Sequence, residues 1–175
     1  MLRTRDLALV SAFAAVLVVY GYVSSPLRPF TRSTELFFLI SVLFAVLAII
    51  VHKSGVVSLV ATVAGIVYLA IPGAPFPLHI AASLISNGLA FDLYLKAMGG
   101  LEPLSPRRIA AAGAVGSLVM AVVGLTVFQI SGTNLTPIVW VLAIVIDTPV
   151  GWLGARFGLH VARRIESTTT VSVSR

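Results

Sequence analysis

The chain has 175 residues, of which 58% are hydrophobic and only 10% are charged, and its mean hydropathy is +1.05. Soluble domains carry about 25% charged residues, and a soluble core of this length could not enclose so much apolar surface. The composition therefore predicts a protein that crosses a membrane several times. The net charge of +6 does not indicate nucleic-acid binding, because the basic residues lie in short segments between apolar runs.

Residue types and motifs exclude several kinds of chemistry. The chain has no cysteine, which removes disulfides and thiolate catalysis. Its three histidines lack the H-x-x-H spacing of a metal site. There is no G-x-x-x-x-G-K-[ST] motif for ATP hydrolysis and no pairing of a nucleophile with a base. We therefore expect no enzyme, no cofactor and no metal.

Apolar runs separated by turn-forming residues predict six membrane helices. They are Leu7–Ser24, Leu36–Val51, Val56–Ile71, Leu78–Met98, Ile109–Ile130 and Pro137–Leu159. We expect an all-α bundle in one membrane domain, residues 1–166, and a flexible tail, residues 167–175. A signal peptide is the competing interpretation of Met1–Ser25, but that run is long and ends without an A-x-A cleavage site.

The basic residues predict how the chain is oriented in the membrane. With the N-terminus inside, ten of the twelve Lys and Arg residues fall on the inner side and only Arg28 and Arg32 on the outer side. Short cytoplasmic loops carry such an excess of positive charge. We therefore expect a multi-pass protein of the cell membrane with both termini in the cytoplasm.

Polar residues at membrane depth are the first candidates for function, because they are costly there. Asp147 lies near the middle of the sixth helix, and His79, Ser83 and Asn87 follow one face of the fourth. These side chains either line a cavity or tie helices together by hydrogen bonds. Asp92, by contrast, has Lys96 at i+4, which predicts an ion pair on the surface of the fourth helix.

A second group of candidates lies near the predicted outer ends of the helices. The group comprises Glu35, Tyr68, Gln129, Asn134 and Trp140. Aromatic residues at this level are usually belt residues. Their coincidence with acidic and amide side chains near proline-rich connections indicates the lining of a small-molecule pocket.

Small residues recur at helical spacing on three of the predicted helices, where they allow close helix packing. The first helix carries Ala8, Ala12 and Ala15, which face either the bundle or a separate membrane subunit. The fifth and sixth helices carry Gly113, Ser117, Ala121, Gly124, Gly151, Ala155 and Gly158. We expect the latter two stripes to pack within the bundle.

The chain resembles the substrate-binding S component of an energy-coupling factor (ECF) vitamin transporter. The resemblance lies in its size, its six predicted helices, its predicted cytoplasmic termini and three segments. The segments are Arg3–Gly21 with its A-x-x-x-A, the outer loop Pro26–Glu35, and NGLAFDLYLKAMG at Asn87–Gly99. The resemblance implies an outward-facing pocket for a vitamin or its precursor. It also implies that Ala8, Ala12 and Ala15 dock on a transmembrane coupling subunit served by two ATPase subunits.

The sequence leaves both the ligand and one alternative function open. Asp147 and Glu35 favour a cationic, thiamine-like ligand, whereas Arg28 and Arg32 favour an anion. In the alternative, the chain is a small structural or assembly subunit of a larger membrane complex. Its polar stripes would then only join helices, and it would bind no ligand.

Overall fold

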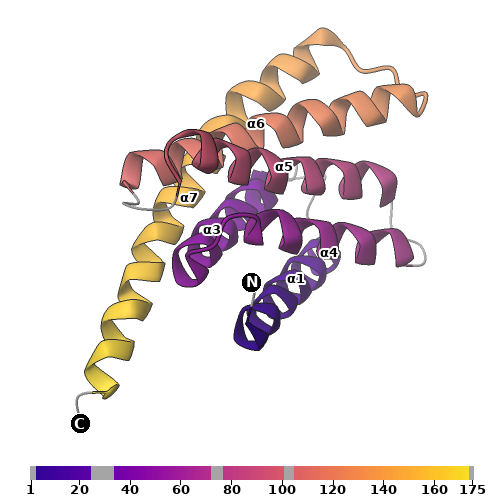
Figure 1. Ribbon diagram of the computed structural model, residues 1–175. Coiled ribbons are helices and arrows are strands. Elements are labelled where there is room, and N and C mark those ends of the chain that lie inside the picture. The colour runs from indigo at the N-terminus through magenta and orange to yellow at the C-terminus, as the bar shows by residue number, and fades with distance from the viewer. Residues whose placement is uncertain (1–2, 25–33, 72–76, 101–104, 174–175) are drawn as a thin grey trace.

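The computed structural model describes residues 3–24, 34–71, 77–100 and 105–173, with side chains described up to residue 167. Within these ranges the regular elements are six α-helices, and there is no strand. The helices are α1 (Thr4–Val23), α3 (Thr34–Val51), α4 (Val56–Ala70), α5 (Pro77–Ala97), α6 (Pro106–Ile130) and α7 (Pro137–Val173) (Figure 1). The predicted all-α class and the six helices are confirmed.

Five of the described helices are long and apolar enough to cross a membrane. The exception, α4, has 15 residues and spans about 22 Å, less than the roughly 30 Å of a hydrocarbon core. One face of α4, with Val57, Val60, Ala61 and Ala64, is fully buried in the bundle. The chain therefore has the character of a multi-pass membrane protein, and a crossing by α4 remains a prediction.

The last helix is longer than the sequence predicts. We expected it to end at Leu159, but α7 continues to Val173 and has 37 residues. Neither glycine nor proline follows Gly158, so nothing in the sequence interrupts the helix after the apolar run ends. At about 55 Å, α7 exceeds the thickness of a hydrocarbon core, and Figure 1 shows its end projecting from the bundle.

The helices pack in an order that differs from their order in the chain. Helix α7 packs against both α3 and α6, α6 packs against α5, and α5 packs against α4. Helix α1 lies at the edge of the bundle, mainly against α4. Helices α3, α5, α6 and α7 therefore form a connected group, and α1 lies outside this group.

Glycines bring α7 close to its two neighbours. A Cβ built on Gly113 of α6 would overlap Ala155 and the Gly151 carbonyl, and one on Gly151 would overlap Ser117. On the other side of α7, Gly158 lies against the backbone of Val42 in α3. Because small residues allow such close approach, the predicted packing of these stripes inside the bundle is confirmed.

Asp92 is a tie between helices, and its predicted ion pair with Lys96 is wrong. Its carboxylate accepts hydrogen bonds from the Ser58 backbone N–H at 2.7 Å and the Ser58 hydroxyl at 2.6 Å. Ser58 lies in the first turn of α4, where backbone N–H groups lack helical partners and favour negative charge. Asp92 therefore joins α5 to the start of α4.

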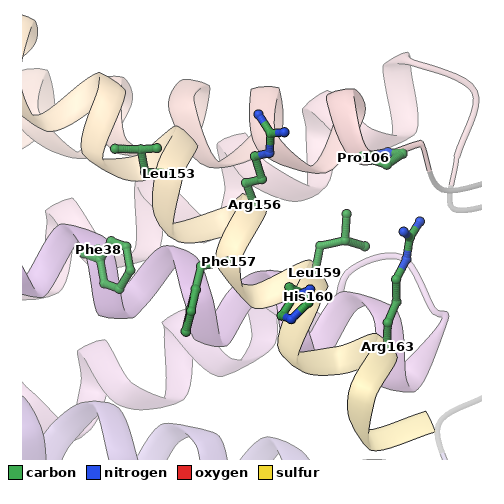
Figure 2. A pocket seen from close by; sticks show the side chains of 8 residues that line it. All are labelled: Phe38, Pro106, Leu153, Arg156, Phe157, Leu159, His160 and Arg163. Carbon is green, nitrogen blue, oxygen red and sulfur yellow. The ribbon is translucent and has the colours of Figure 1, made fainter. Parts of the chain in front are cut away.

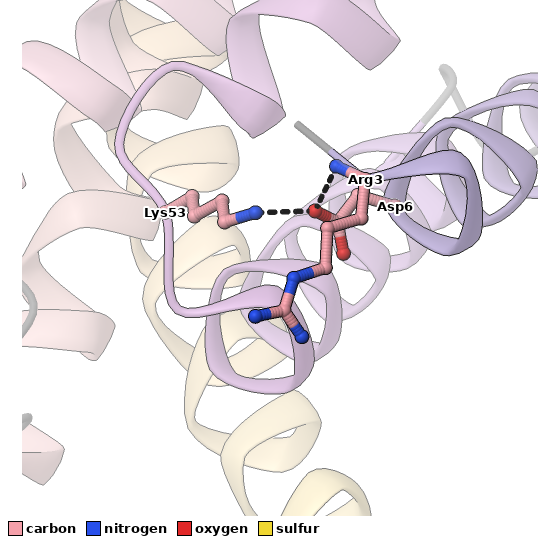
Figure 3. Close-up of polar contacts among 3 residues, drawn as sticks. All are labelled: Arg3, Asp6 and Lys53. Atoms are coloured by element: carbon pink, nitrogen blue, oxygen red, sulfur yellow. Dashed lines mark hydrogen bonds and ion pairs between the residues drawn. The ribbon is translucent and has the colours of Figure 1, made fainter. Parts of the chain in front are cut away.

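A second polar tie, which the sequence analysis missed, holds the start of α1. The Asp6 carboxylate accepts hydrogen bonds from the backbone N–H of Arg3, at 2.8 Å, and from the ammonium group of Lys53 (Figure 3). Lys53 belongs to the connection between α3 and α4. The ion pair between Asp6 and Lys53 therefore fixes the N-terminal end of α1 to the connection between α3 and α4.

Candidate functional site

A cavity of about 720 Å³ lies between α3, α5, α6 and α7. It is bounded by the beginnings of α3, α5 and α7 and by the last turns of α6, which the charge distribution predicts to lie on the outer side. Most of its walls are apolar. The lining residues are Thr34, Leu36, Phe37, His79, Ile80, Ser83, Met120, Ala121, Gly124, Leu125, Phe128, Ile138, Val139, Leu142, Ala143, Ile146 and Asp147.

Asp147 is the acidic residue of this lining. The residue is 7% exposed, and no hydrogen bond joins its carboxylate to another described residue, although its oxygens are not fully enclosed. The surrounding wall consists of aliphatic residues such as Leu142, Ala143 and Ile146. A carboxylate in such a setting lacks the partners that normally compensate its burial, so it is available to a ligand.

His79 and Ser83 lie one turn apart on the α5 side of the cavity. The His79 and Phe128 rings form a T-shaped pair, with an interplanar angle of 90° and ring centroids 4.6 Å apart. Gly124 makes room for this ring, because a Cβ there would lie 2.9 Å from His79 Nε2. The Ser83 hydroxyl donates to the His79 carbonyl at 2.7 Å, so its oxygen retains lone pairs that can accept from a ligand.

Glu35 lies at the rim, between two residues that line the cavity, Thr34 and Leu36. Both of its carboxylate oxygens are buried and have no hydrogen-bond partner among the described residues. Glu35 itself is not part of the lining. The predicted outer-loop residues Arg28 and Arg32 lie outside the described residues.

Asn87 lies behind the cavity wall. It is buried, with 1% exposed, and its amide group donates to the sulfur of Met120 at 3.2 Å. Met120 in turn lines the cavity, and Asn87 contacts the position of Gly116 in α6. The observed role of Asn87 is therefore to join α5 to α6.

Four other predicted residues lie away from the cavity. The Tyr68 hydroxyl lies against Gly21 and donates to the Val18 carbonyl at 3.3 Å, so Tyr68 joins α4 to α1. Gln129 and Asn134 are exposed, and Trp140 is half-exposed on α7 outside the lining. Of the nine predicted site residues, the structure thus brings His79, Ser83 and Asp147 together around one cavity.

The apolar lining residues, among them Phe37, Met120 and Phe128, were not predicted. In a membrane protein an apolar side chain facing a cavity has the same sequence signature as one facing lipid. Gly124 leaves space for the His79 ring and could have indicated the cavity. That inference requires knowing that α5 and α6 are neighbours, which the sequence does not state.

The predicted docking stripe is on the outside of the bundle. Ala8, Ala12 and Ala15 are all exposed, whereas Val10 and Leu17 on the opposite face of α1 are buried against the other helices. No other described part of the chain covers this stripe. The face is therefore available to a separate membrane subunit or to lipid.

Comparison with protein-family models, with curated proteins and with solved structures found no match.

Proposed function

We propose that this chain is the membrane-embedded binding subunit of an ATP-driven micronutrient uptake transporter of the ECF type. It binds a vitamin or vitamin precursor from the outside, in the cavity between α3, α5, α6 and α7, and performs no reaction on it. It docks through Ala8, Ala12 and Ala15 on a transmembrane coupling subunit, which works with two ATPase subunits.

The observation that carries this proposal is Asp147, which is 7% exposed and lines an apolar cavity without a hydrogen bond to a described residue. A charged residue at the centre of a membrane helix costs about 2.5–3.5 kcal/mol, and no contact with the described residues offsets this cost. A ligand with a cationic or hydrogen-bond-donating group would supply the missing partner. Ligand pockets of about 300–1,000 Å³ hold small organic molecules, and the cavity's 720 Å³ falls in this range.

The chemistry of the walls favours a flat, partly apolar ligand that carries positive charge or several N–H donors. Phe37 and Phe128 provide aromatic surface, and aromatic rings stack or meet edge to face with a second ring. Asp147 is the acidic residue of the lining. A heterocyclic cation or an aminopyrimidine-like ring would meet the aromatic walls with its ring and Asp147 with its charge or its N–H donors.

The docking part of the proposal is supported by the exposed small-residue face of α1. Membrane helices associate through such faces because their backbones can approach closely. Helix α1 contacts the bundle mainly through α4, so a partner can approach Ala8, Ala12 and Ala15 without displacing another described helix.

The experiment that tests the function is mass spectrometry of the protein purified gently from its own membrane with its partners retained. We expect a bound small molecule of vitamin size, a transmembrane partner and ATPase subunits. A chain that carries no small molecule and is bound only to unrelated membrane subunits would overturn the proposal and favour the structural-subunit alternative.

A further inference from the structure

A second hollow of about 620 Å³ lies on the outside of the bundle, near the opposite end of α7 from the ligand cavity. Arg156, His160 and Arg163 of α7 form its polar part, and Phe38, Leu153 and Phe157 are among its apolar walls. Figure 2 shows Arg156 and Arg163 extending to the same side of α7, with His160 between them along the helix. We call this hollow the α7 groove.

The α7 groove concentrates positive charge on one helical face. Arg156, His160 and Arg163 occupy positions i, i+4 and i+7, which share a face of a helix and extend over about 10 Å. All three are exposed, and neither arginine forms an ion pair with a described carboxylate. Arg156 lies over the ring of Trp152, 5.1 Å from its centroid, which holds its guanidinium at the surface.

Apolar side chains next to these cations are left open. Phe157 and Leu153 are each 52% exposed, and Phe157 lies beside Phe38 of α3 with ring centroids 5.9 Å apart. An exposed apolar surface directly beside cations suits a ligand that is apolar at one end and anionic at the other.

The helix ends around the groove indicate the edge of the membrane. Pro106, the first residue of α6, also lines the groove, and Arg107 and Arg108 follow it in the first turn of that helix. We therefore place His160 and Arg163 near the headgroups, and Leu153 and Phe38 towards the acyl chains. The excess of basic residues at this end predicts the cytoplasmic leaflet, which carries anionic lipids.

We propose that the α7 groove binds an anionic phospholipid. The lipid phosphate lies between Arg156 and Arg163, whose planar guanidinium groups pair with phosphate through parallel hydrogen bonds, and His160 donates a further hydrogen bond. The first part of an acyl chain lies against Phe38 and Phe157. This site is independent of the ligand cavity and of the transport proposal.

Trp152 supplies a local probe of this binding. The chain contains two tryptophans, so a Trp140→Phe parent leaves Trp152, one turn from Arg156, as the single fluorophore. This parent is placed in phosphatidylcholine vesicles that contain either brominated phosphatidylglycerol or brominated phosphatidylcholine at the same fraction. The ratio of the two quenching constants measures the local preference for the anionic lipid. Because both constants are measured on the same variant, an effect of the substitution on Trp152 emission itself does not change the ratio.

We expect the quenching ratio of the parent to favour the anionic lipid at least fivefold. A single basic residue near an anionic membrane surface strengthens binding by about that factor. Arg156→Gln/Arg163→Gln should bring the ratio close to one. Arg5→Gln/Lys96→Gln, which removes the same charge from exposed positions outside the groove, should leave the ratio unchanged. Millimolar inorganic phosphate in the buffer should not alter it.

Three results would overturn the proposal. An equal loss of preference in both double variants would show diffuse attraction to the whole basic end. Loss of the preference on adding inorganic phosphate would assign the groove to a soluble anion. A parent ratio of one would exclude an anionic lipid and leave this face to a protein partner.

Discussion

The Asp92 carboxylate of α5 accepts two hydrogen bonds from Ser58 of α4, one from its backbone N–H and one from its hydroxyl. The two residues are 34 positions apart in the chain, and the contact joins the C-terminal half of α5 to the first turn of α4. Because α4 is the shortest described helix and α1 rests mainly on it, this contact holds two helices in place.

We therefore expect Asp92→Ala to destabilise the protein by about 1–3 kcal/mol, the cost of leaving buried donors without a partner. Unfolding of the purified protein in mixed micelles on titration with a denaturing detergent measures the change. Lys96→Gln is the matched control and should be neutral, because Lys96 does not pair with Asp92. If Lys96→Gln destabilises the protein as much as Asp92→Ala, the observed pairing is wrong.

The sequence was sufficient to predict the helices because each apolar run is bounded by proline, glycine or a polar cluster. It was less able to predict where they start and end. Helix α6 begins at Pro106, before the apolar run, because the Ser105 side chain accepts a hydrogen bond from the Arg108 N–H at 3.2 Å and caps a basic first turn. Helix α7 likewise continues past its apolar run, since no residue breaks it.

The site was predictable only where it is polar. His79, Ser83 and Asp147 were recognised because polar groups are costly at membrane depth, and they do line one cavity. Tyr68 lies near the end of α4, as expected, but its hydroxyl points toward Gly21 of α1, since a residue's position along a helix does not determine which neighbour it faces. The direction depends on which helices are neighbours, which one sequence does not contain.

Close packing of α6 on α7 gives a second prediction. Gly113→Leu introduces a side chain where the Gly151 backbone and Ala155 leave no space, so α7 must move. We expect a loss of at least about 2 kcal/mol, within the range of overpacked cores, measured by the same detergent titration. Thr126→Leu adds a leucine to an exposed position of the same helix and should change stability by less than about 0.5 kcal/mol. Equal effects of the two variants would contradict the observed packing.

Removing the charge of Asp147 tests the ligand cavity. Asp147→Asn keeps the size of the side chain but removes the negative charge, so we expect a ligand identified by mass spectrometry to bind at least about tenfold more weakly, or about 1.4 kcal/mol. Equilibrium dialysis of the purified protein measures this affinity. Gln129→Ala, at an exposed position outside the lining, is the control and should bind normally. Unchanged affinity in Asp147→Asn, with the fold preserved, would show that the charge of Asp147 takes no part in ligand binding.

The exposed face of α1 separates ligand binding from docking. Ala12→Trp places a large ring in the middle of the stripe formed with Ala8 and Ala15, so a partner helix can no longer approach closely. The ligand cavity is formed by other helices, so we expect the affinity of the purified subunit for its ligand to stay within about twofold. Uptake by cells that express the whole transporter should fall at least about tenfold.

Leu93→Trp provides the matched control for this experiment. Leu93 is an exposed residue of α5, 62% exposed, so the same ring is added to the surface of a different helix. We expect this variant to support normal uptake and to retain the coupling subunit on purification. If both tryptophan variants lose uptake equally, or if Ala12→Trp retains the partner and full uptake, the α1 face is not the docking surface. In that case contact with lipid alone would explain its exposure.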